Sequence, residues 1–269
     1  MTVYNDKMMY LCKLLVIKMK YAIIAAGEGS RLLQEGVGVP KPLVEVCGER
    51  LIDRLIRIFV AEGADEVCVI CNDLSQHVSN HLSALQRDGL QGMPIPLRFC
   101  VKTTSSSMHS FYELSDWLEG TEPFVLTTVD TIFREEEFHH YVAAFKESVT
   151  MGYDGMMGVT DFVDDEKPLY VGVDADEQLI NGFYDEVNDT APLFVSGGIY
   201  GLTPQVLLTL KRCIERGESR MRNFQRALVA DGLKLQAYRF SKVLDIDHKS
   251  DIRKATAFLQ NEEEVYLWQ

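Results

Sequence analysis

Two glycines, an arginine and a lysine near the start of this sequence have the types and spacing of a polyphosphate-binding site. Gly27 and Gly29 follow the apolar run 21–26, Arg31 comes two residues later, and Lys41 lies between two prolines. A glycine turn presents successive backbone N–H groups that bind phosphate oxygens, and a guanidinium group matches the same oxygens through paired hydrogen bonds. Because proline fixes φ, the two prolines restrict the backbone around Lys41. We therefore expect these four residues to bind a polyphosphate.

The element that positions this turn is a strand. The run 21–26 has the length and apolar content of a buried parallel strand. Two familiar phosphate-binding motifs do not fit the residues after this strand. A dinucleotide-binding fingerprint needs a third glycine where Leu32 stands, and the Gly-Lys-Ser/Thr of a Walker A loop is absent. An ordinary strand–loop junction remains the alternative interpretation of the Gly-x-Gly turn alone.

The longer string Ala-Ala-Gly-x-Gly-Ser-Arg-Leu at 25–32, followed by Pro-Lys-Pro-Leu at 40–43, resembles the signature of the sugar-nucleotide pyrophosphorylases and related nucleotidyltransferases. The resemblance extends from Lys20 to about Leu259. It implies that the glycine turn and Arg31 hold the β- and γ-phosphates of a nucleoside triphosphate, and that Lys41 contacts the α-phosphate. The catalytic residues would be Arg31 and Lys41, and the nucleotide-binding residues of this segment would be Ala25, Ala26, Gly27, Gly29 and Ser30.

Helix-like and strand-like stretches alternate through the first half of the chain. Helical spacing of apolar residues covers 51–61 and 75–85, and strand-like runs cover 66–71, 97–101 and 123–129. This alternation is typical of an α/β protein. Together with the resemblance, it predicts a three-layer α/β/α fold with a mostly parallel, twisted sheet that is Rossmann-like and of the GT-A type.

The pattern changes after Met151. Short strand-like pieces at 155–160, 169–174, 178–184 and 194–200 predict a β-rich insertion that binds the acceptor, and helices at 203–216 and 224–230 and a strand at 235–240 come after it. We expect a single nucleotidyltransferase domain over 19–269, with 1–18 as an N-terminal extension outside the fold. Its nucleotide-binding half would span about 19–150, its acceptor-binding part about 151–201, and a closing segment with the metal site about 202–260.

A hydroxyl-rich segment precedes the helix expected after the third strand. It reads Lys-Thr-Thr-Ser-Ser-Ser-Met-His-Ser at 102–110, and such residues commonly cap helices. In the family that the sequence resembles, this position contacts the base and ribose, and its form here is especially similar to choline-phosphate cytidylyltransferases of bacterial envelope pathways. We expect Ser106 and Ser107 to contact the nucleotide, with a plain capping role as the alternative.

Three aspartates are the expected metal ligands. Asp130 follows the strand 123–129, at the sheet edge where open α/β proteins bind ligands. Asp245 and Asp247 are two residues apart, so in a strand their side chains would face the same side. Two such carboxylates repel one another unless a cation lies between them. With the first-ligand role that the resemblance assigns to Asp130, these residues predict a Mg²⁺ site.

The resemblance also implies which residues bind the acceptor. Val-Gly-Val at 171–173 and Ser-Gly-Gly-Ile-Tyr at 196–200 are similar to family segments, which points to Gly172 and Gly198. The family's Glu-Lys-Pro aligns with Asp-Glu-Val at 185–187, so Glu186 is kept and Val187 replaces the lysine that holds a sugar phosphate. Lys167 or Lys242 could substitute for it, unless each is a solvated surface lysine. Aromatic rings that could contact a cationic or less polar acceptor, or else pack in the core, belong to Tyr170, Phe183 and Tyr184.

Composition narrows the possible partners and location. The formal net charge of −13 argues against binding to nucleic acid or to an anionic membrane surface. The apolar patch 8–17 is too short and too charged to span a membrane, so we expect no membrane insertion and a cytoplasmic location. Cys68 and Cys71 would point to opposite faces of one strand, which favours buried reduced thiols over a metal or redox pair.

These expectations combine into one reaction. A phosphate oxygen of a phosphorylated small-molecule acceptor attacks the α-phosphorus of a nucleoside triphosphate, and pyrophosphate leaves. Such a reaction requires positioning and charge neutralisation rather than a covalent nucleophile. A GT-A glycosyltransferase is one alternative, although the expected Asp-x-Asp is replaced by Val-Asp-Thr at 129–131. A non-catalytic nucleotide-sensing relative is the other, although such relatives typically lose the lysine or a metal carboxylate, and both are kept here.

Overall fold

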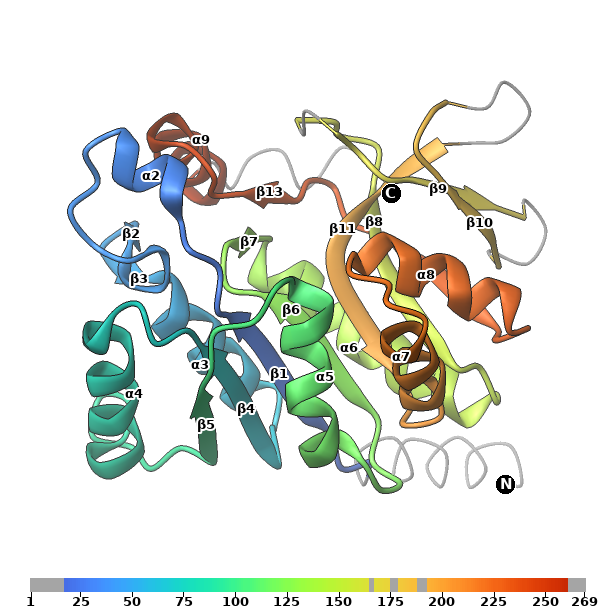
Figure 1. Cartoon of the computed structure of the whole chain (residues 1–269), viewed down its shortest axis with the longest axis horizontal. Helices are drawn as coiled ribbons and strands as arrows, with labels where there is room; N and C mark the ends of the chain where they lie inside the picture. Colours follow the sequence, from blue (N-terminus) through green and yellow to red (C-terminus); the bar gives the residue numbers. More distant parts are fainter. Residues whose placement is uncertain (1–16, 165–166, 175–178, 188–192, 261–269) are drawn as a thin grey trace, which may run out of the picture.

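The computed structural model describes residues 17–164, 167–174, 179–187 and 193–260. Within them, the centre of the fold is a nine-stranded sheet (Figure 1). The strand order is β10-β9-β11-β6-β1-β4-β5, and β8 pairs with both β11 and β12. The strands are β1 (Lys20–Ala25), β4 (Glu66–Cys71), β5 (Leu97–Val101), β6 (Phe124–Thr128), β8 (Gly155–Thr160), β9 (Tyr170–Val173), β10 (Ile180–Tyr184), β11 (Leu193–Leu202) and β12 (Leu235–Arg239).

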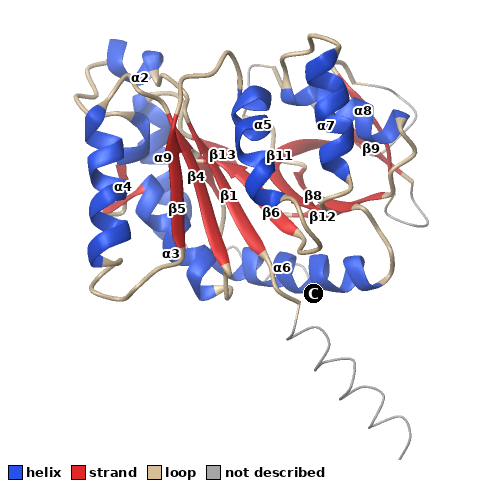
Figure 2. Ribbon diagram, turned by 60° about the horizontal axis from the view of Figure 1, so that its bottom comes forward, coloured by secondary structure: helices blue, strands red, loops and turns tan. Residues whose placement is uncertain are grey.

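Helices cover both faces of this sheet, which confirms the predicted three-layer α/β/α fold (Figure 2). Buried residues of α3, α4, α6 and α9 pack in one apolar cluster, and those of α5, α7 and α8 pack in another. The helices are α2 (Ser30–Gln34), α3 (Leu51–Ala61), α4 (Gln76–Asp88), α5 (Ser107–Leu118), α6 (Glu135–Thr150), α7 (Val206–Glu215), α8 (Met221–Ala230) and α9 (Lys249–Gln260), with a 3₁₀ turn η1 (Lys41–Leu43).

The continuous apolar run of β1 follows from its central position. Tyr21 and Ile23 pack into the cluster on one face of the sheet, whereas Ala22 and Ile24 pack into the cluster on the other. A strand covered on both faces has no solvent side, so alternation of polar and apolar residues is lost. β1 pairs in parallel with β4 and β6, and β4 pairs in parallel with β5.

The β-rich region after residue 151 extends the same sheet instead of forming a separate one. β11 runs antiparallel to β6 and joins β8 and β9 to the parallel half. A bulge interrupts β11 between Ser196 and Ile199, and Gly198 within it has a φ of 68°. Only glycine adopts this left-handed backbone readily, which explains the Gly-Gly pair there.

Several predicted boundaries agree with the structure, and the others differ by one to three residues. The strands 66–71, 97–101 and 155–160 and the helix 51–61 are found with the predicted bounds. The helix predicted from Thr203 begins instead at Val206. Thr203 does not cap it, because its N–H and hydroxyl both donate to the carbonyl of Asp154, at 3.0 and 3.2 Å.

Both cysteines of the predicted pair lie in β4. Cys68 packs in one apolar cluster and Cys71 in the other, so the pair does point to opposite faces, and both thiols are free. Burial raises the pKa of Cys68 to about 12 and that of Cys71 to about 11, which keeps both thiols protonated. Among the described residues, no helix has the length and apolar character needed to cross a bilayer.

Candidate active site

The glycine turn connects β1 to the short helix α2 at the carboxyl edge of the sheet. Gly29 precedes α2 with a left-handed φ of 63°. A Cβ added at Gly29 would lie 3.1 Å from the Cβ of Lys41, which is closer than side chains normally pack. A Cβ at Gly27 would meet nothing within 4 Å. The first glycine therefore leaves the turn open to a ligand, whereas the second lets Lys41 approach.

Asn72 supports this turn from the neighbouring strand end. It directly follows β4 and is 8% exposed. Its amide nitrogen donates to the carbonyls of Ala26 and Gly27, each at 3.1 Å. Asn72 was not among the predicted site residues, although a polar residue immediately after a buried strand was a usable signal. Its two hydrogen bonds fix the turn that the predicted phosphate site needs.

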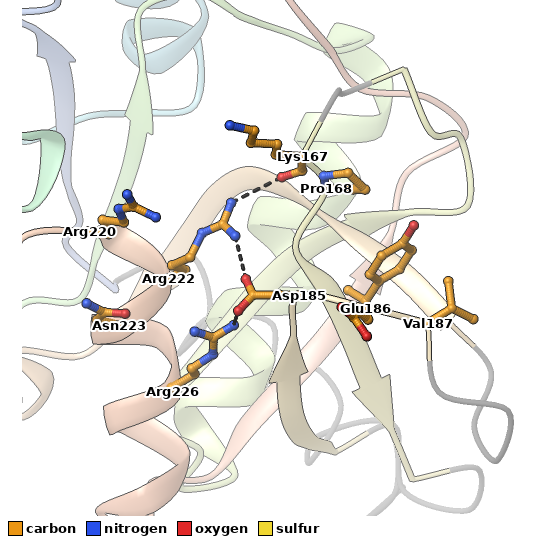
Figure 3. Close-up of a pocket in the computed structure, with 10 residues that line it drawn as sticks. Lys167, Pro168, Asp185, Glu186, Val187, Arg220, Arg222, Asn223 and Arg226 are labelled. Atoms are coloured by element: carbon orange, nitrogen blue, oxygen red, sulfur yellow. Dashed lines mark hydrogen bonds and ion pairs between the residues drawn. The ribbon is translucent and has the colours of Figure 1, made fainter.

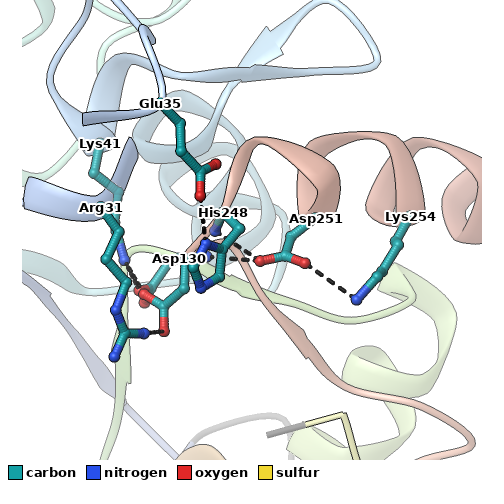
Figure 4. Close-up of polar contacts among 8 residues, drawn as sticks. Arg31, Glu35, Lys41, Asp130, His248, Asp251 and Lys254 are labelled. Atoms are coloured by element: carbon teal, nitrogen blue, oxygen red, sulfur yellow. Dashed lines mark hydrogen bonds and ion pairs between the residues drawn. The ribbon is translucent and has the colours of Figure 1, made fainter. Parts of the chain in front are cut away.

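Lys41 forms the centre of the site. Its ammonium nitrogen donates to Oδ2 of Asp130 at 2.6 Å and to Oδ1 of Asp247 at 2.7 Å. The side chain of Lys41 is only 10% exposed. Arg31 reaches the same group, with its Nη1 3.2 Å from Oδ2 of Asp247. Figure 4 shows Arg31, Lys41 and Asp130 gathered in this way. The structure thus brings together four of the predicted catalytic and metal residues, which we call the charged centre.

Electrostatics keep Lys41 and Asp247 ionised. Burial works against the charged form of Lys41, but Asp130 and Asp247 outweigh burial and hold the pKa of Lys41 above its ordinary value. Burial also favours neutral Asp247, yet Lys41 and Arg31 hold the pKa of Asp247 below its ordinary value. An ammonium group held this way stays positive at any physiological pH. Lys41 can therefore act as a permanent charge toward phosphate.

The strand predicted through Asp247 ends earlier. β13 covers only Leu244–Asp245 and pairs with β7 (Thr131–Ile132), which follows Asp130. The chain then turns, and the N–H groups of Asp247 and His248 both donate to the carboxylate of Asp251 in α9. The prediction that strand alternation aligns Asp245 with Asp247 is therefore wrong. A helix-capping turn, rather than a strand, directs Asp247 to Lys41.

Asp130 and Asp247 fit a divalent-cation site, because both carboxylates converge on one cation, the Lys41 ammonium. Mg²⁺ is commonly held by one or two carboxylates and completed by substrate phosphates. In the part of the chain that the structure describes, no three His, Cys, Asp or Glu side chains gather as a cation site. The three-aspartate Mg²⁺ site stays a prediction, in which Asp130 and Asp247 are the pair that the structure brings together.

A cavity of about 300 Å³ lies on one side of the charged centre, and we call it the serine pocket. Ser106 and Ser107 line it, together with Gly27, Lys41 and Asp130. Ser106 also caps α5, accepting a hydrogen bond from the N–H of His109 at 3.4 Å. The capping role therefore exists, and it leaves both serines on the pocket wall. The further hydroxyls on that wall belong to Thr104, Ser105, Ser110 and Thr128.

A second cavity of about 270 Å³ lies on the other side, and we call it the aspartate pocket. Its wall includes Arg31 and Asp247 of the charged centre, and also Asp245. The β-rich region contributes Pro168 and Ser196 to the same wall. The remaining charged side chains on its wall are Asp164, His248, Asp251 and Lys254. The charged centre thus borders two separate cavities.

The predicted acceptor residues are spread over the β-rich region. Gly198 lies in the β11 bulge beside Thr131, near the aspartate pocket. Gly172 lies in β9, where an added Cβ would clash with the side chains of Asn181 and Tyr184, so its role there is close packing. Glu186 lines a third cavity together with Val187.

The alternatives for the missing lysine and the aromatic contacts also have places in the structure. The ammonium of Lys242 lies 4.3 Å from the ring centre of Phe162, a cation–π contact. Phe183 is 5% exposed and packs in the core, whereas Tyr170 lines the third cavity. Of the three predicted aromatic contacts, Phe183 therefore has the core role that was its alternative interpretation.

Glu35 ties the glycine-turn helix to the C-terminal segment. One of its carboxylate oxygens lies 2.6 Å from Nδ1 of His248 (Figure 4). The other accepts from the N–H of Lys249 at 2.7 Å. The hydrogen bond to Glu35 raises the pKa of His248, and the same contact lowers that of Glu35. These contacts hold the end of α2 against the start of α9. Because Arg31 lies in α2 and Asp247 lies just before α9, the same contacts help to keep these two residues close together.

Comparisons with known proteins identify the family and the fold. Residues 21–221 match the family model that describes the MobA-like NTP transferase domain. Among solved structures, one described as a glucose-1-phosphate thymidylyltransferase from Bacillus anthracis superposes with a TM-score of 0.75 at 17% identity, covering 90% of this chain and 96% of that one.

Two further structures superpose over similar lengths. The inositol-1-phosphate CTP transferase from T. maritima gives a TM-score of 0.69 at 18% identity, covering 91% of this chain and 98% of that one. A UDP-glucose pyrophosphorylase complexed with UDP-glucose gives 0.71 at 17% identity, covering 90% and 98%. At these identities the likeness establishes a shared fold over nearly the whole of each chain.

Proposed function

This chain belongs to the family of MobA-like NTP transferase domains, and we propose that it transfers a nucleotidyl group from a nucleoside triphosphate to a phosphorylated acceptor and releases pyrophosphate. The observation that carries this proposal is the position of the charged centre between two cavities. Lys41 and Asp130 line the serine pocket, whereas Arg31 and Asp247 line the aspartate pocket. A reaction that joins two phosphorylated molecules needs such a shared cationic junction.

The serine pocket would take the nucleoside. Its hydroxyl groups can accept from and donate to a base and ribose, and the Gly27 turn at its mouth can approach the triphosphate closely. The acceptor would enter the aspartate pocket from the β-rich region. The neighbouring structures are named for thymidylyl, cytidylyl and uridylyl transfer or binding, which supports nucleotidyl transfer without selecting a base.

Within the charged centre each residue has a separable role. The Lys41 ammonium would stabilise negative charge that develops on the α-phosphate oxygens, and the Arg31 guanidinium would hold oxygens of the leaving pyrophosphate. Asp130 and Asp247 would hold Mg²⁺, which supplies charge neutralisation between the phosphates when bound. Asn72 and Gly29 position the turn and Lys41, respectively, and contribute no reacting atom.

We further propose that glucose-1-phosphate is not the preferred acceptor. By the resemblance, Val187 stands where the family carries an acceptor-binding lysine. Val187 is 59% exposed, and because valine is uncharged it supplies no charge to a phosphate. A phosphorylated alcohol such as phosphocholine, or an unusual sugar phosphate, fits this position better. Lys242 is an unsuitable substitute, because its ammonium is engaged with aromatic rings.

The test is pyrophosphate release measured with each of four nucleoside triphosphates against glucose-1-phosphate, inositol-1-phosphate and phosphocholine. Acceptor-dependent pyrophosphate release supports nucleotidyl transfer, and release with none of the combinations contradicts it. A competition between glucose-1-phosphate and phosphocholine, in the wild type and in Val187→Lys, tests the acceptor proposal. That proposal is wrong if the wild type already prefers glucose-1-phosphate and the new lysine changes nothing.

A further inference from the structure

A third cavity, of about 740 Å³, lies between α8 and the β9–β10 hairpin, and we call it the arginine pocket (Figure 3). Four basic side chains line it, those of Lys167, Arg220, Arg222 and Arg226, against two acidic ones, Asp185 and Glu186. This excess of positive charge stands in a protein whose formal net charge is −13. A local basic cavity on an acidic protein concentrates anionic ligands.

The arginines occur at a helix end that normally disfavours them. Arg220 is the N-cap of α8 and Arg222 lies in its first turn, which contains no acidic residue. The N-terminus of a helix carries partial positive charge, so cationic side chains there are destabilising. Local rules of this kind are broken mainly at functional sites. Helix stability therefore does not explain why arginines occupy these positions.

The carboxylate of Asp185 forms ion pairs with both Arg222 and Arg226. One carboxylate oxygen of Asp185 accepts from Arg222 at 2.5 Å and the other pairs with Arg226 at 2.7 Å. The Asp185 side chain is 55% exposed, so water can replace it at little cost. The Arg220 guanidinium makes no hydrogen bond or ion pair with any residue that the structure describes. The pocket thus combines a carboxylate-sized clamp with an additional cation.

The arginine pocket adjoins the aspartate pocket. Pro168 lines both cavities, and Gln225 of α8 donates to the hydroxyl of Ser196 on the aspartate-pocket wall at 3.1 Å. A molecule whose phosphate reaches Arg31 and Asp247 at one end of the aspartate pocket can therefore extend past Pro168 toward the arginines. α8 lines the arginine pocket and, through Gln225, is joined to the wall of the aspartate pocket.

We propose that the acceptor carries a second anionic group, a carboxylate or a second phosphate, and that Arg220, Arg222 and Arg226 recognise it. This inference rests on the proposed nucleotidyl transfer and adds the substrate class. Of the acceptors proposed above, it favours an unusual, anionic sugar phosphate over phosphocholine, whose ammonium the arginines would repel. The reacting phosphate lies at the charged centre, and the second anion replaces Asp185 between the guanidinium groups. Bidentate arginine contacts of this kind select for planar carboxylates and phosphates.

The experiment compares acceptors that differ only in the second anion. The pairs are glucuronate-1-phosphate with glucose-1-phosphate, phosphoserine with phosphoethanolamine, and inositol-1,4-bisphosphate with inositol-1-phosphate. Initial rates of pyrophosphate release give KM for each compound, and saturation-transfer NMR gives its binding without turnover. We expect the anionic member of at least one pair to have a KM and a Kd lower by about tenfold or more, as charge-assisted hydrogen bonds provide.

Variants then assign the preference to the arginines. Arg222→Gln and Arg226→Gln should remove the preference, raising KM for the anionic member with little change in kcat. Asp185→Asn removes the competing carboxylate and should tighten its binding. Arg212→Gln is the matched control and should leave the preference intact. Arg212 lies on α7, pairs with Asp231 at 2.8 Å and lies outside the pocket.

The outcomes separate the two proposals. Equal binding within every pair, or a preference that survives Arg222→Gln and Arg226→Gln, overturns the arginine assignment even if pyrophosphate release is observed. If no acceptor supports pyrophosphate release, the proposed function is contradicted. In that case a binding preference that NMR detects in the wild type, and that is lost in the arginine variants, still supports the anion site. If Asp185→Asn lowers the melting temperature without tightening binding, the cluster is only a structural clamp and the inference is wrong.

Discussion

Removing the ammonium of Lys41 gives the most direct test of the charged centre. In Lys41→Met the alkyl chain is largely kept, so the contact with Gly29 is preserved, but both hydrogen bonds to Asp130 and Asp247 are lost. We expect turnover to fall about a hundredfold or more, which corresponds to about 2.7 kcal/mol of transition-state stabilisation. The KM for the triphosphate should change little, because the lost contact strengthens mainly as charge develops.

The same substitution should change stability and cation binding in opposite directions. It leaves two carboxylates without the cation that they share, one of them only 17% exposed, and we expect a cost of about 1–3 kcal/mol in the free energy of unfolding. Because Asp247 is 46% exposed, water reduces this cost toward the lower end. The freed carboxylates should bind Mn²⁺ at least several-fold more tightly in the absence of nucleotide.

Three assays check these expectations: pyrophosphate release, urea unfolding and Mn²⁺ titration followed by electron paramagnetic resonance. Lys242→Met is the control, because Lys242 contacts Phe162 and Phe258 and is absent from the charged centre. Near-normal turnover in Lys41→Met would refute the assignment of Lys41 to the reaction. Unchanged Mn²⁺ affinity would refute the argument that its ammonium occupies the position of a divalent cation.

Further predictions concern the neighbours of Lys41. Gly29→Ala should lose turnover and about 1–2 kcal/mol of stability. Gly36 is the control, because it also has a positive φ but its added Cβ meets nothing within 4 Å, so Gly36→Ala should lose stability alone. Equal turnover in both variants would contradict the positioning role of Gly29. Asp130→Asn should lower turnover and raise the Mg²⁺ concentration needed for half-maximal rate, and full activity in excess chelator would exclude a metal role. Because the folded-state pKa of Asp247 is depressed, its ionisation stabilises the fold above the unfolded pKa of about 3.9 and this contribution is lost as pH falls through the folded value. The stability difference between wild type and Asp247→Asn, measured by urea unfolding, should therefore persist at pH 5–7 and shrink below about pH 4; a constant difference would contradict the ion pair.

The parts of the fold that the sequence predicted well are those set by local pattern. The strand Glu66–Cys71 and the helix Leu51–Ala61 have unbroken hydrophobic signals bounded by glycine or polar residues. Arg31 and Asp130 were selected because they follow recognisable strand ends, and Lys41 because it lies between two prolines in the string Pro-Lys-Pro-Leu. In each case the information needed was contained within a few neighbouring residues.

The contacts that sequence could not supply join distant parts of the chain. Lys41 and Asp247 are 206 positions apart, and Glu35 and His248 are 213 apart. Asp247 was predicted from strand alternation, but a helix-capping turn orients it toward Lys41. Nothing in the local sequence around Arg222 and Arg226 indicates that the fold sets them against Asp185. Such pairings depend on the order of strands in the sheet.

The separation of Lys41 from Asp247 along the chain also sets the order in which the residues of the charged centre emerge from the ribosome. The strands β1, β4, β5 and β6 can pair once residue 128 has emerged, because all four come from the first half of the chain. Lys41 can then already bond Asp130, so the nascent site holds a neutral pair instead of an isolated buried charge. At about 5–20 residues per second, the remaining stretch to Asp247 takes about 6–24 s. During that time the nascent chain contains the strands of the nucleotide half, and one of the two carboxylates that bind Lys41 has still to be synthesised.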